Sequence, residues 1–180
     1  ITLLIDIPLG IVIATHKRVD QIVSPVIYAL YPIPKIALLP ILVLFFGLGD
    51  ASKIILVGLI IFFQILVSTR DGVKAINPSY YVSMRTLGAT KWQIYRHMII
   101  PATVPNLFTS LRLSIGTSIS VLFFAENFAT ERGIGYFIMD SWLKLDYLGM
   151  FAGIVAISLM GVFLFACIDF LEHKIYRWHA

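Results

Sequence analysis

Long apolar stretches alternate with short polar ones along this chain. They cover residues 1–15, 23–48, 53–69, 104–125 and 148–168. A helix of about 20 apolar residues crosses a hydrocarbon core about 30 Å thick, and the stretches after the first are close to that length. The pattern therefore predicts an all-α membrane protein with about five spans. We expect the first span to be truncated, because the chain opens within an apolar run.

The second stretch carries an unusual set of prolines, namely Pro25, Pro32, Pro34 and Pro40. In a membrane bundle, neighbouring helices satisfy the backbone groups that a proline leaves free. We therefore expect a single kinked helix over 23–48. A polar stretch over 72–103 separates the third span from the fourth, and a loop with a short helix leads from the fourth span to Tyr147.

The composition agrees with lipid as the solvent. Apolar residues make up 59% of the chain and charged residues 13%, with a mean hydropathy of +0.90. Soluble domains are about one quarter charged. These values exclude a disordered chain, a disulfide-stapled secreted module and a typical soluble enzyme. The single cysteine, Cys167, cannot form a disulfide within the chain.

The basic residues indicate the orientation. If the polar loop after the third span is cytoplasmic, nine Lys and Arg lie on that side: Lys17, Arg18, Arg70, Lys74, Arg85, Lys91, Arg96, Lys174 and Arg177. Three lie outside: Lys53, Arg132 and Lys144. Cytoplasmic loops carry the basic excess, so the C-terminus is predicted to be cytoplasmic. The net charge of +4 then reflects topology and gives no reason to expect a nucleic-acid partner.

The polar loop begins with a predicted short helix. Asn77 is a good N-cap, and Pro78 suits the first helical position. The helix is expected to run to Leu87. Gly88 can adopt the left-handed conformation that ends a helix.

A second short helix should follow. Thr90 and Gln93 have the spacing of a capping box, and the helix is expected to stop at Pro101. The pair could be an ordinary helical loop or a docking element for a soluble partner. A helix-turn-helix for DNA is disfavoured because apolar spans flank it. The first helix carries residues of the types enriched at protein interfaces, which are candidates for contacts with a partner: Tyr80, Tyr81, Met84 and Arg85.

This loop resembles the EAA loop of ABC importer permeases, whose pattern is EAA, three residues, G, nine residues and I-x-L-P. Gly88 matches the glycine, and residues 98–101 (Met-Ile-Ile-Pro) match the last four positions. The chain departs from the pattern at residues 82–84, where Val-Ser-Met replaces EAA. Residues 31–40, 46–49, 52–53, 125–126 and 133–138 further resemble the nitrate, sulfonate, taurine and bicarbonate branch of these permeases.

The resemblance implies a MetI-like transmembrane bundle in a bacterial-type inner membrane, with residues 1–180 as one domain and 75–101 as its coupling loop. It implies a dimer with a second permease copy, ABC ATPase subunits at the cytoplasmic face and an external substrate-binding protein. The chain has no Walker A loop, so it should not hydrolyse ATP itself. The implied ATPase-coupling residues are Asn77, Pro78, Tyr80, Tyr81, Met84, Arg85, Leu87, Gly88, Ala89 and Pro101.

The fourth span offers candidates for a translocation pathway. Ser110, Ser114 and Ser118 recur every four residues and share one helix face. Small residues at this spacing pack helices closely, and their hydroxyls could instead face a polar cavity. Arg112 either faces protein or water within the bundle or extends its side chain to the membrane surface.

At the outer side, Glu126, Gly133 and Gly135 are candidates for a gate. Asp6 in the first stretch could be hydrogen-bonded within the bundle, for example to Thr2. The sequence shows no catalytic set, no metal-ligand cluster and no cofactor motif. Two other readings remain open, an ion-coupled transporter and a membrane-embedded enzyme. The substrate class suggested by the resemblance is a small anion or organic solute, with a pyrimidine-type vitamin precursor as the alternative.

Overall fold

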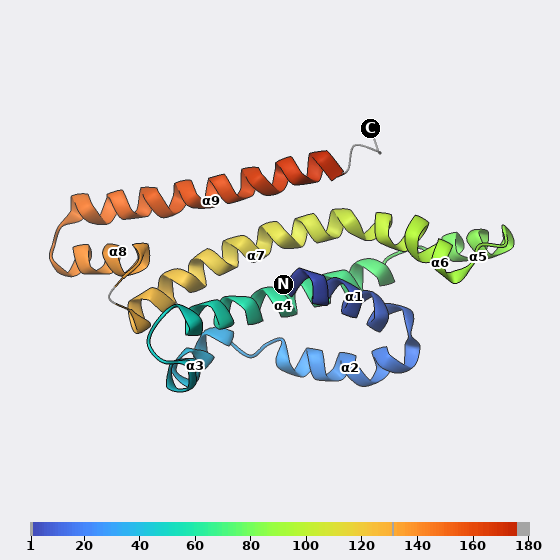
Figure 1. The fold of residues 1–180 in the computed structure, drawn as a ribbon, viewed down its shortest axis with the longest axis horizontal. Coiled ribbons are helices and arrows are strands. Elements are labelled where there is room, and N and C mark those ends of the chain that lie inside the picture. Colours follow the sequence, from blue (N-terminus) through green and yellow to red (C-terminus); the bar gives the residue numbers. More distant parts are fainter. Residues whose placement is uncertain (1, 131, 176–180) are drawn as a thin grey trace. The chain divides into compact units, whose positions relative to one another are not determined.

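The structure is a computed structural model that describes residues 2–130 and 132–175, and the described residues form helices and connecting turns without strands (Figure 1). They fall into two compact units. The first unit comprises residues up to 33 together with 62–111, and the second unit comprises the rest. Two long helices contribute to both units: α4 (Asp50–Lys74) and α7 (Ile100–Ala129).

In the first unit, α1 (Thr2–Thr15) packs against α4 at a point of close approach. A Cβ on Gly10 would lie 2.7 Å from Cβ of Thr69. Because that distance is shorter than real contacts, any larger residue at position 10 would force the two helices or the Thr69 side chain to shift. Around this point, buried Ile13 of α1, Ile27 of α2 (Lys17–Leu30) and Leu66 of α4 form an apolar cluster.

The proline-rich stretch 23–48 is not one kinked helix, and the sequence prediction was wrong here. The helix α2 ends at Leu30, η1 (Lys35–Leu38) is a single 3-10 turn, and α3 (Leu39–Phe46) follows. Pro32 and Pro34 cause the break, because each lacks an N–H and disfavours helical backbone at the residue before it. Pro25 lies inside α2, and Pro40 stands in the first turn of α3, where it costs little.

The second helix of the polar loop does not stop at Pro101, which is a further correction. The short helix α6 (Lys91–Ile94) passes through a π-helical turn, η2 (Tyr95–Ile99), directly into α7. The N–H of Ile100 donates to the carbonyl of Tyr95, five residues back. This widened turn lies just before the proline, and such turns relieve the clash that a proline causes inside a helix.

In the second unit, α8 (Ile134–Leu143) packs against α9 (Tyr147–Ile175), as the ribbon shows (Figure 1). A Cβ on Gly153 would lie 2.5 Å from Cγ1 of Ile138, so α9 presents a glycine where α8 crosses it. A second apolar cluster joins Leu39, Leu56, Ile60 and Ala125.

Three described helical segments are long and apolar enough to cross a membrane: Asp50–Lys74, Lys91–Phe128 and Tyr147–Ile175. A fourth crossing would combine α2 with α3 across the break, and α1 is shorter. Apart from the break in 23–48, each apolar stretch is therefore helical, and the long helices extend beyond the predicted bounds.

Candidate functional site

The most completely specified local structure is the α5–α6 hairpin, residues 77–94, formed by α5 (Pro78–Thr86), a turn and α6. It begins at the predicted N-cap. The Asn77 side-chain oxygen accepts hydrogen bonds from the Ser79 N–H at 3.0 Å and from its hydroxyl at 2.9 Å. Pro78 occupies the first turn, where a missing N–H is harmless.

The turn of the hairpin depends on Gly88. Its φ is +74°, and its N–H donates to the Arg85 carbonyl at 2.9 Å, while the Ala89 N–H donates to the Met84 carbonyl at 3.0 Å. These two bonds make a Schellman motif, as expected for a glycine that ends a helix. A Cβ at residue 88 would meet nothing within 4 Å, so the requirement for glycine comes from the backbone alone.

The predicted capping box is also present. The Gln93 N–H donates to the Thr90 hydroxyl at 3.3 Å, and the Thr90 N–H donates to the Gln93 side-chain oxygen at 2.7 Å. Two N–H groups at the start of α6 are thereby satisfied. Hydrogen bonds thus define the N-terminus of α5, the turn at Gly88 and the N-terminus of α6.

One face of the hairpin packs inward. Tyr81, Met84 and Ala89 contact an apolar cluster made of Ile11, Val73, Ile94 and Ile99. Burial raises the pKa of the Tyr81 hydroxyl above its ordinary value, and nearby Tyr95 adds to the effect. The hairpin is therefore attached to the ends of α1 and α4.

The opposite face is exposed. Tyr80, Leu87 and Trp92 have exposed fractions of 62%, 83% and 69%. Val82 and Arg85 are exposed as well. Of the predicted contact residues, Tyr80 is thus exposed and Tyr81 and Met84 pack inward, while Arg85 is exposed and also lines a groove on the inward side.

Behind the hairpin lies a groove of ≈ 720 Å³ against the ends of α1 and α4. Its lining includes the apolar residues Val73 and Ile94 and the basic residues His16, Lys74, Arg85 and Lys91.

The serines on this face of α7 are buried or half-buried. Ser110 contacts the Ser68 hydroxyl on α4 and donates to the Asn106 carbonyl at 2.8 Å. Ser114 is 1% exposed. The hydroxyls of Ser114 and Ser118 are buried and have no hydrogen-bond partner among the residues that the structure describes. The sequence spacing correctly placed the three on one face.

Arg112 is bound by carboxylates of α9. It contacts Asp169 at 2.7 Å and also pairs with Glu172. Both partners lie beyond residue 168, the predicted end of the fifth span, so this pairing fits either environment considered from the sequence. No local pattern identifies these partners, because they lie 57 and 60 residues further along the chain.

The three outer candidates come together at the turn between α7 and α8. Glu126 is buried, and its carboxylate accepts a hydrogen bond from the Gly135 N–H at 2.7 Å. Gly133 has φ +121°, and a Cβ there would overlap the Glu126 carboxylate. Glycine is therefore required at 133 by the close approach of the carboxylate, and at 135 mainly by the Phe123 carbonyl oxygen, which would lie 2.8 Å from a Cβ.

Asp6 is fully buried, and neither carboxylate oxygen has a hydrogen-bond partner among the described residues. The side chain of Thr2, expected to bind it, and Arg177 lie outside the described residues. Within the described part of the chain, no three His, Cys, Asp or Glu side chains gather as a metal site.

Residues 6–177 match the family described as binding-protein-dependent transport system inner membrane component. The chain belongs to this family. Membership makes it a multi-pass inner membrane protein and a transport subunit rather than an enzyme, and it counts against the ion-coupled alternative. The predicted recognition as a permease of the MetI-like type is confirmed.

The permease is similar to two relatives over nearly its whole length. A formylaminopyrimidine transport permease of Halalkalibacterium halodurans is 35% identical, over 99% of this chain and 71% of the relative. A taurine transport system permease of Escherichia coli is 32% identical, over 98% of this chain and 64% of the relative. The chain thus spans about two thirds of the length of these relatives, and the taurine permease agrees with the predicted branch.

Proposed function

We propose that this chain is the transmembrane permease subunit of an ATP-driven type I ABC importer. Residues 1–180 form one transmembrane domain, and 75–101 form its coupling loop, with the C-terminus cytoplasmic. One observation carries the proposal, namely the division of the α5–α6 hairpin into a packed inward face and an exposed outward face. Exposed Tyr, Trp and Leu on a rigid element fit a protein partner.

The partner for this face is an ABC ATPase subunit. The sequence has no Walker A loop, so ATP is hydrolysed by a separate polypeptide. A second copy of the permease completes a homodimer, and an external substrate-binding protein delivers the substrate. When the ATPase subunits close, they displace α5, and its inward contacts pass the displacement to α1 and α4.

The serine face of α7 belongs to the substrate pathway in this proposal. The buried hydroxyls of Ser114 and Ser118 support it, because they have no partner among the described residues and a polar substrate or water could satisfy them. Arg112 would position α9 beside this face. Glu126 with Gly133 and Gly135 would form the outer gate.

The substrate is proposed to be a small anion or organic solute of the nitrate, sulfonate and taurine class. The similarity to a taurine permease supports this class. A second candidate is a pyrimidine-type vitamin precursor, which is favoured by the similarity to a formylaminopyrimidine permease.

Co-purification tests the proposal. The tagged permease, expressed together with an ABC ATPase subunit of its own organism and extracted in mild detergent, should retain that ATPase. The double variant Tyr80→Ser with Leu87→Ser should lose it. Both side chains are exposed, so the exchange should change the fold's stability by no more than about 0.5 kcal/mol.

Trp142→Ser provides the control, because Trp142 is another exposed aromatic side chain and lies outside the hairpin. It should retain the ATPase. If the hairpin double variant bound the ATPase as well as the parent does, the proposed coupling surface would be wrong.

A further inference from the structure

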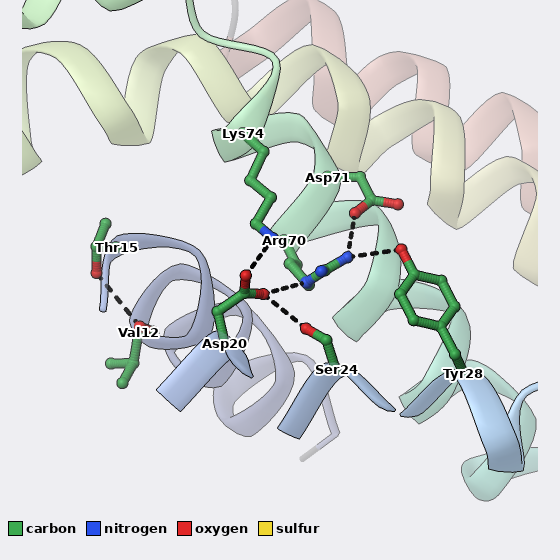
Figure 2. A network of polar contacts seen from close by, with 8 residues as sticks. All are labelled: Val12, Thr15, Asp20, Ser24, Tyr28, Arg70, Asp71 and Lys74. Carbon is green, nitrogen blue, oxygen red and sulfur yellow. Dashed lines mark hydrogen bonds and ion pairs between the residues drawn. The ribbon is translucent and has the colours of Figure 1, made fainter. Parts of the chain in front are cut away.

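Near the C-terminal end of α4 lies a buried arginine with several polar partners (Figure 2). Arg70 donates from Nε to Asp20 at 2.9 Å, and from Nη1 to the Tyr28 hydroxyl at 2.9 Å and to Asp71 at 2.8 Å. Its guanidinium also lies 5.3 Å from the centre of the Tyr28 ring. The whole residue is only 6% exposed.

Asp20 of α2 is the second centre of this group. Besides Arg70, it accepts hydrogen bonds from the Ser24 hydroxyl at 2.6 Å and from the Lys74 ammonium at 2.6 Å (Figure 2). We refer to the group as the Arg70 cluster, defined as Asp20, Ser24, Tyr28, Arg70, Asp71 and Lys74. Two carboxylates balance two cations in it.

The cluster holds α2 over much of its length. Asp20 and Tyr28 are eight residues apart on one helix, which corresponds to about 12 Å at 1.5 Å per residue. One planar guanidinium contacts both side chains. Because the fork of arginine donors is rigid, α2 is fixed in position and orientation relative to the end of α4.

The backbone between the end of α4 and the hairpin is held by hydrogen bonds. The Ala75 N–H donates to the Asp71 carbonyl at 2.9 Å, and the Ile76 N–H donates to the Val73 carbonyl at 3.3 Å. Asn77, the N-cap of α5, comes next. The backbone that precedes the hairpin is thus bonded to the end of α4, and one of these bonds is to Asp71 of the Arg70 cluster.

A buried ion pair adds little stability compared with well-packed apolar side chains of similar size. What the Arg70 cluster supplies is a fixed geometry between α2 and the hairpin. We propose that Arg70 and Asp20 are positioning residues that make α2 move together with the coupling hairpin when nucleotide binds. This inference rests on the proposed function, since it assumes that an ATPase displaces the hairpin.

The decisive variant is Arg70→Lys. It keeps the positive charge but cannot contact Asp20, Tyr28 and Asp71 through one rigid fork. Arg18→Lys is the matched control, because Arg18 is an exposed residue of the same helix α2 outside the cluster. Should Arg70→Lys fail to assemble, the apolar pair Asp20→Leu with Arg70→Met replaces it, since it leaves no charge buried without a partner.

The measurement uses spin labels on the complete complex with its ATPase. Cys167 is exposed and is first changed to serine. Ala75→Cys then reports on the start of the hairpin and Gln21→Cys on α2, both at exposed positions. Pulsed electron resonance gives the distance between the two copies of each label, with and without ATP and vanadate.

In the parent and in Arg18→Lys, both distances should shift on adding ATP and vanadate. In Arg70→Lys, the Ala75 shift should persist and the Gln21 shift should be lost. An undiminished Gln21 shift in Arg70→Lys, or in the apolar pair, would overturn the inference. If neither distance shifted in the parent, the proposed function itself would fail, which is a distinguishable result.

Discussion

At the scale of single residues, Gly88 shows how one backbone angle defines a functional element. Its φ of +74° is disfavoured for residues with a side chain, at a cost of about 1–2 kcal/mol. The space around it is open, so a side chain would not clash. The turn should therefore respond to the backbone preference of the residue and not to its size.

Because backbone preference and side-chain size have separate effects at residue 88, two substitutions there should differ. Gly88→Val should disrupt the hairpin and reduce ATPase retention severalfold, because a β-branched residue resists the left-handed conformation. Gly88→Asn should retain most of the ATPase, since asparagine tolerates that conformation. Co-purification of the ATPase measures both. Equal retention by the two variants would mean that the turn geometry does not matter for binding.

The Glu126 carboxylate is a second case in which a single side chain defines a turn, here the one between α7 and α8. It accepts a hydrogen bond from the Gly135 N–H, and a hydrogen bond to a charged group contributes about 1.5–3 kcal/mol. We expect Glu126→Ala to lower the thermal unfolding midpoint in detergent by several degrees. Glu126→Gln keeps an acceptor and should lower it less. Equal losses in the two variants would show that the charge, rather than this hydrogen bond, matters at the turn.

At the scale of elements, the positions where helices meet are set by the small residues that allow close approach. Gly10 of α1 and Thr69 of α4 form such a pair. The sequence marks Gly10 only as a glycine within an apolar run. Its partner is 59 residues away, and no local pattern identifies it.

The pair can be tested by mutation. Gly10→Ala should destabilise the protein by about 1–3 kcal/mol, because the new Cβ overlaps Thr69. In a Thr69→Gly background the same exchange should cost less, since two residues in contact are coupled. Thermal unfolding in detergent gives both values. Gly58→Ala on α4, where a Cβ meets nothing within 4 Å, is the control and should not destabilise. Equal costs of Gly10→Ala in both backgrounds would contradict the contact.

The start of α7 is continuous with the preceding helical turns and passes through Pro101. The sequence rule that a helix stops at proline failed at Pro101, because the π-helical turn over Tyr95–Ile99 accommodates it. The Thr103 hydroxyl donates to the Ile99 carbonyl at 3.0 Å and supports the same region. Since the helix is continuous, the hairpin is joined to α7 by rigid backbone rather than by a flexible loop.

At the scale of the whole molecule, the distribution of basic residues predicts the topology. In the Cys167→Ser background, Lys17→Cys should react with a membrane-impermeant maleimide only after cells are permeabilised. Arg132→Cys should react in intact cells. Both positions are exposed, so access is limited by the membrane alone. The reverse labelling pattern would invert the topology and move the hairpin away from any cytoplasmic ATPase.

The sequence by itself determined that the chain is helical and membrane-embedded, and it specified the hairpin of residues 77–94 almost completely. It could do so because hydrophobic length, N-caps, a capping box and a left-handed glycine act within a few residues of the chain. Tertiary structure alone decided that Tyr81 packs inward while Tyr80 is exposed, and that Arg70 binds Asp20. Those outcomes depend on segments tens of residues apart, whose contacts exist only after the helices have packed together.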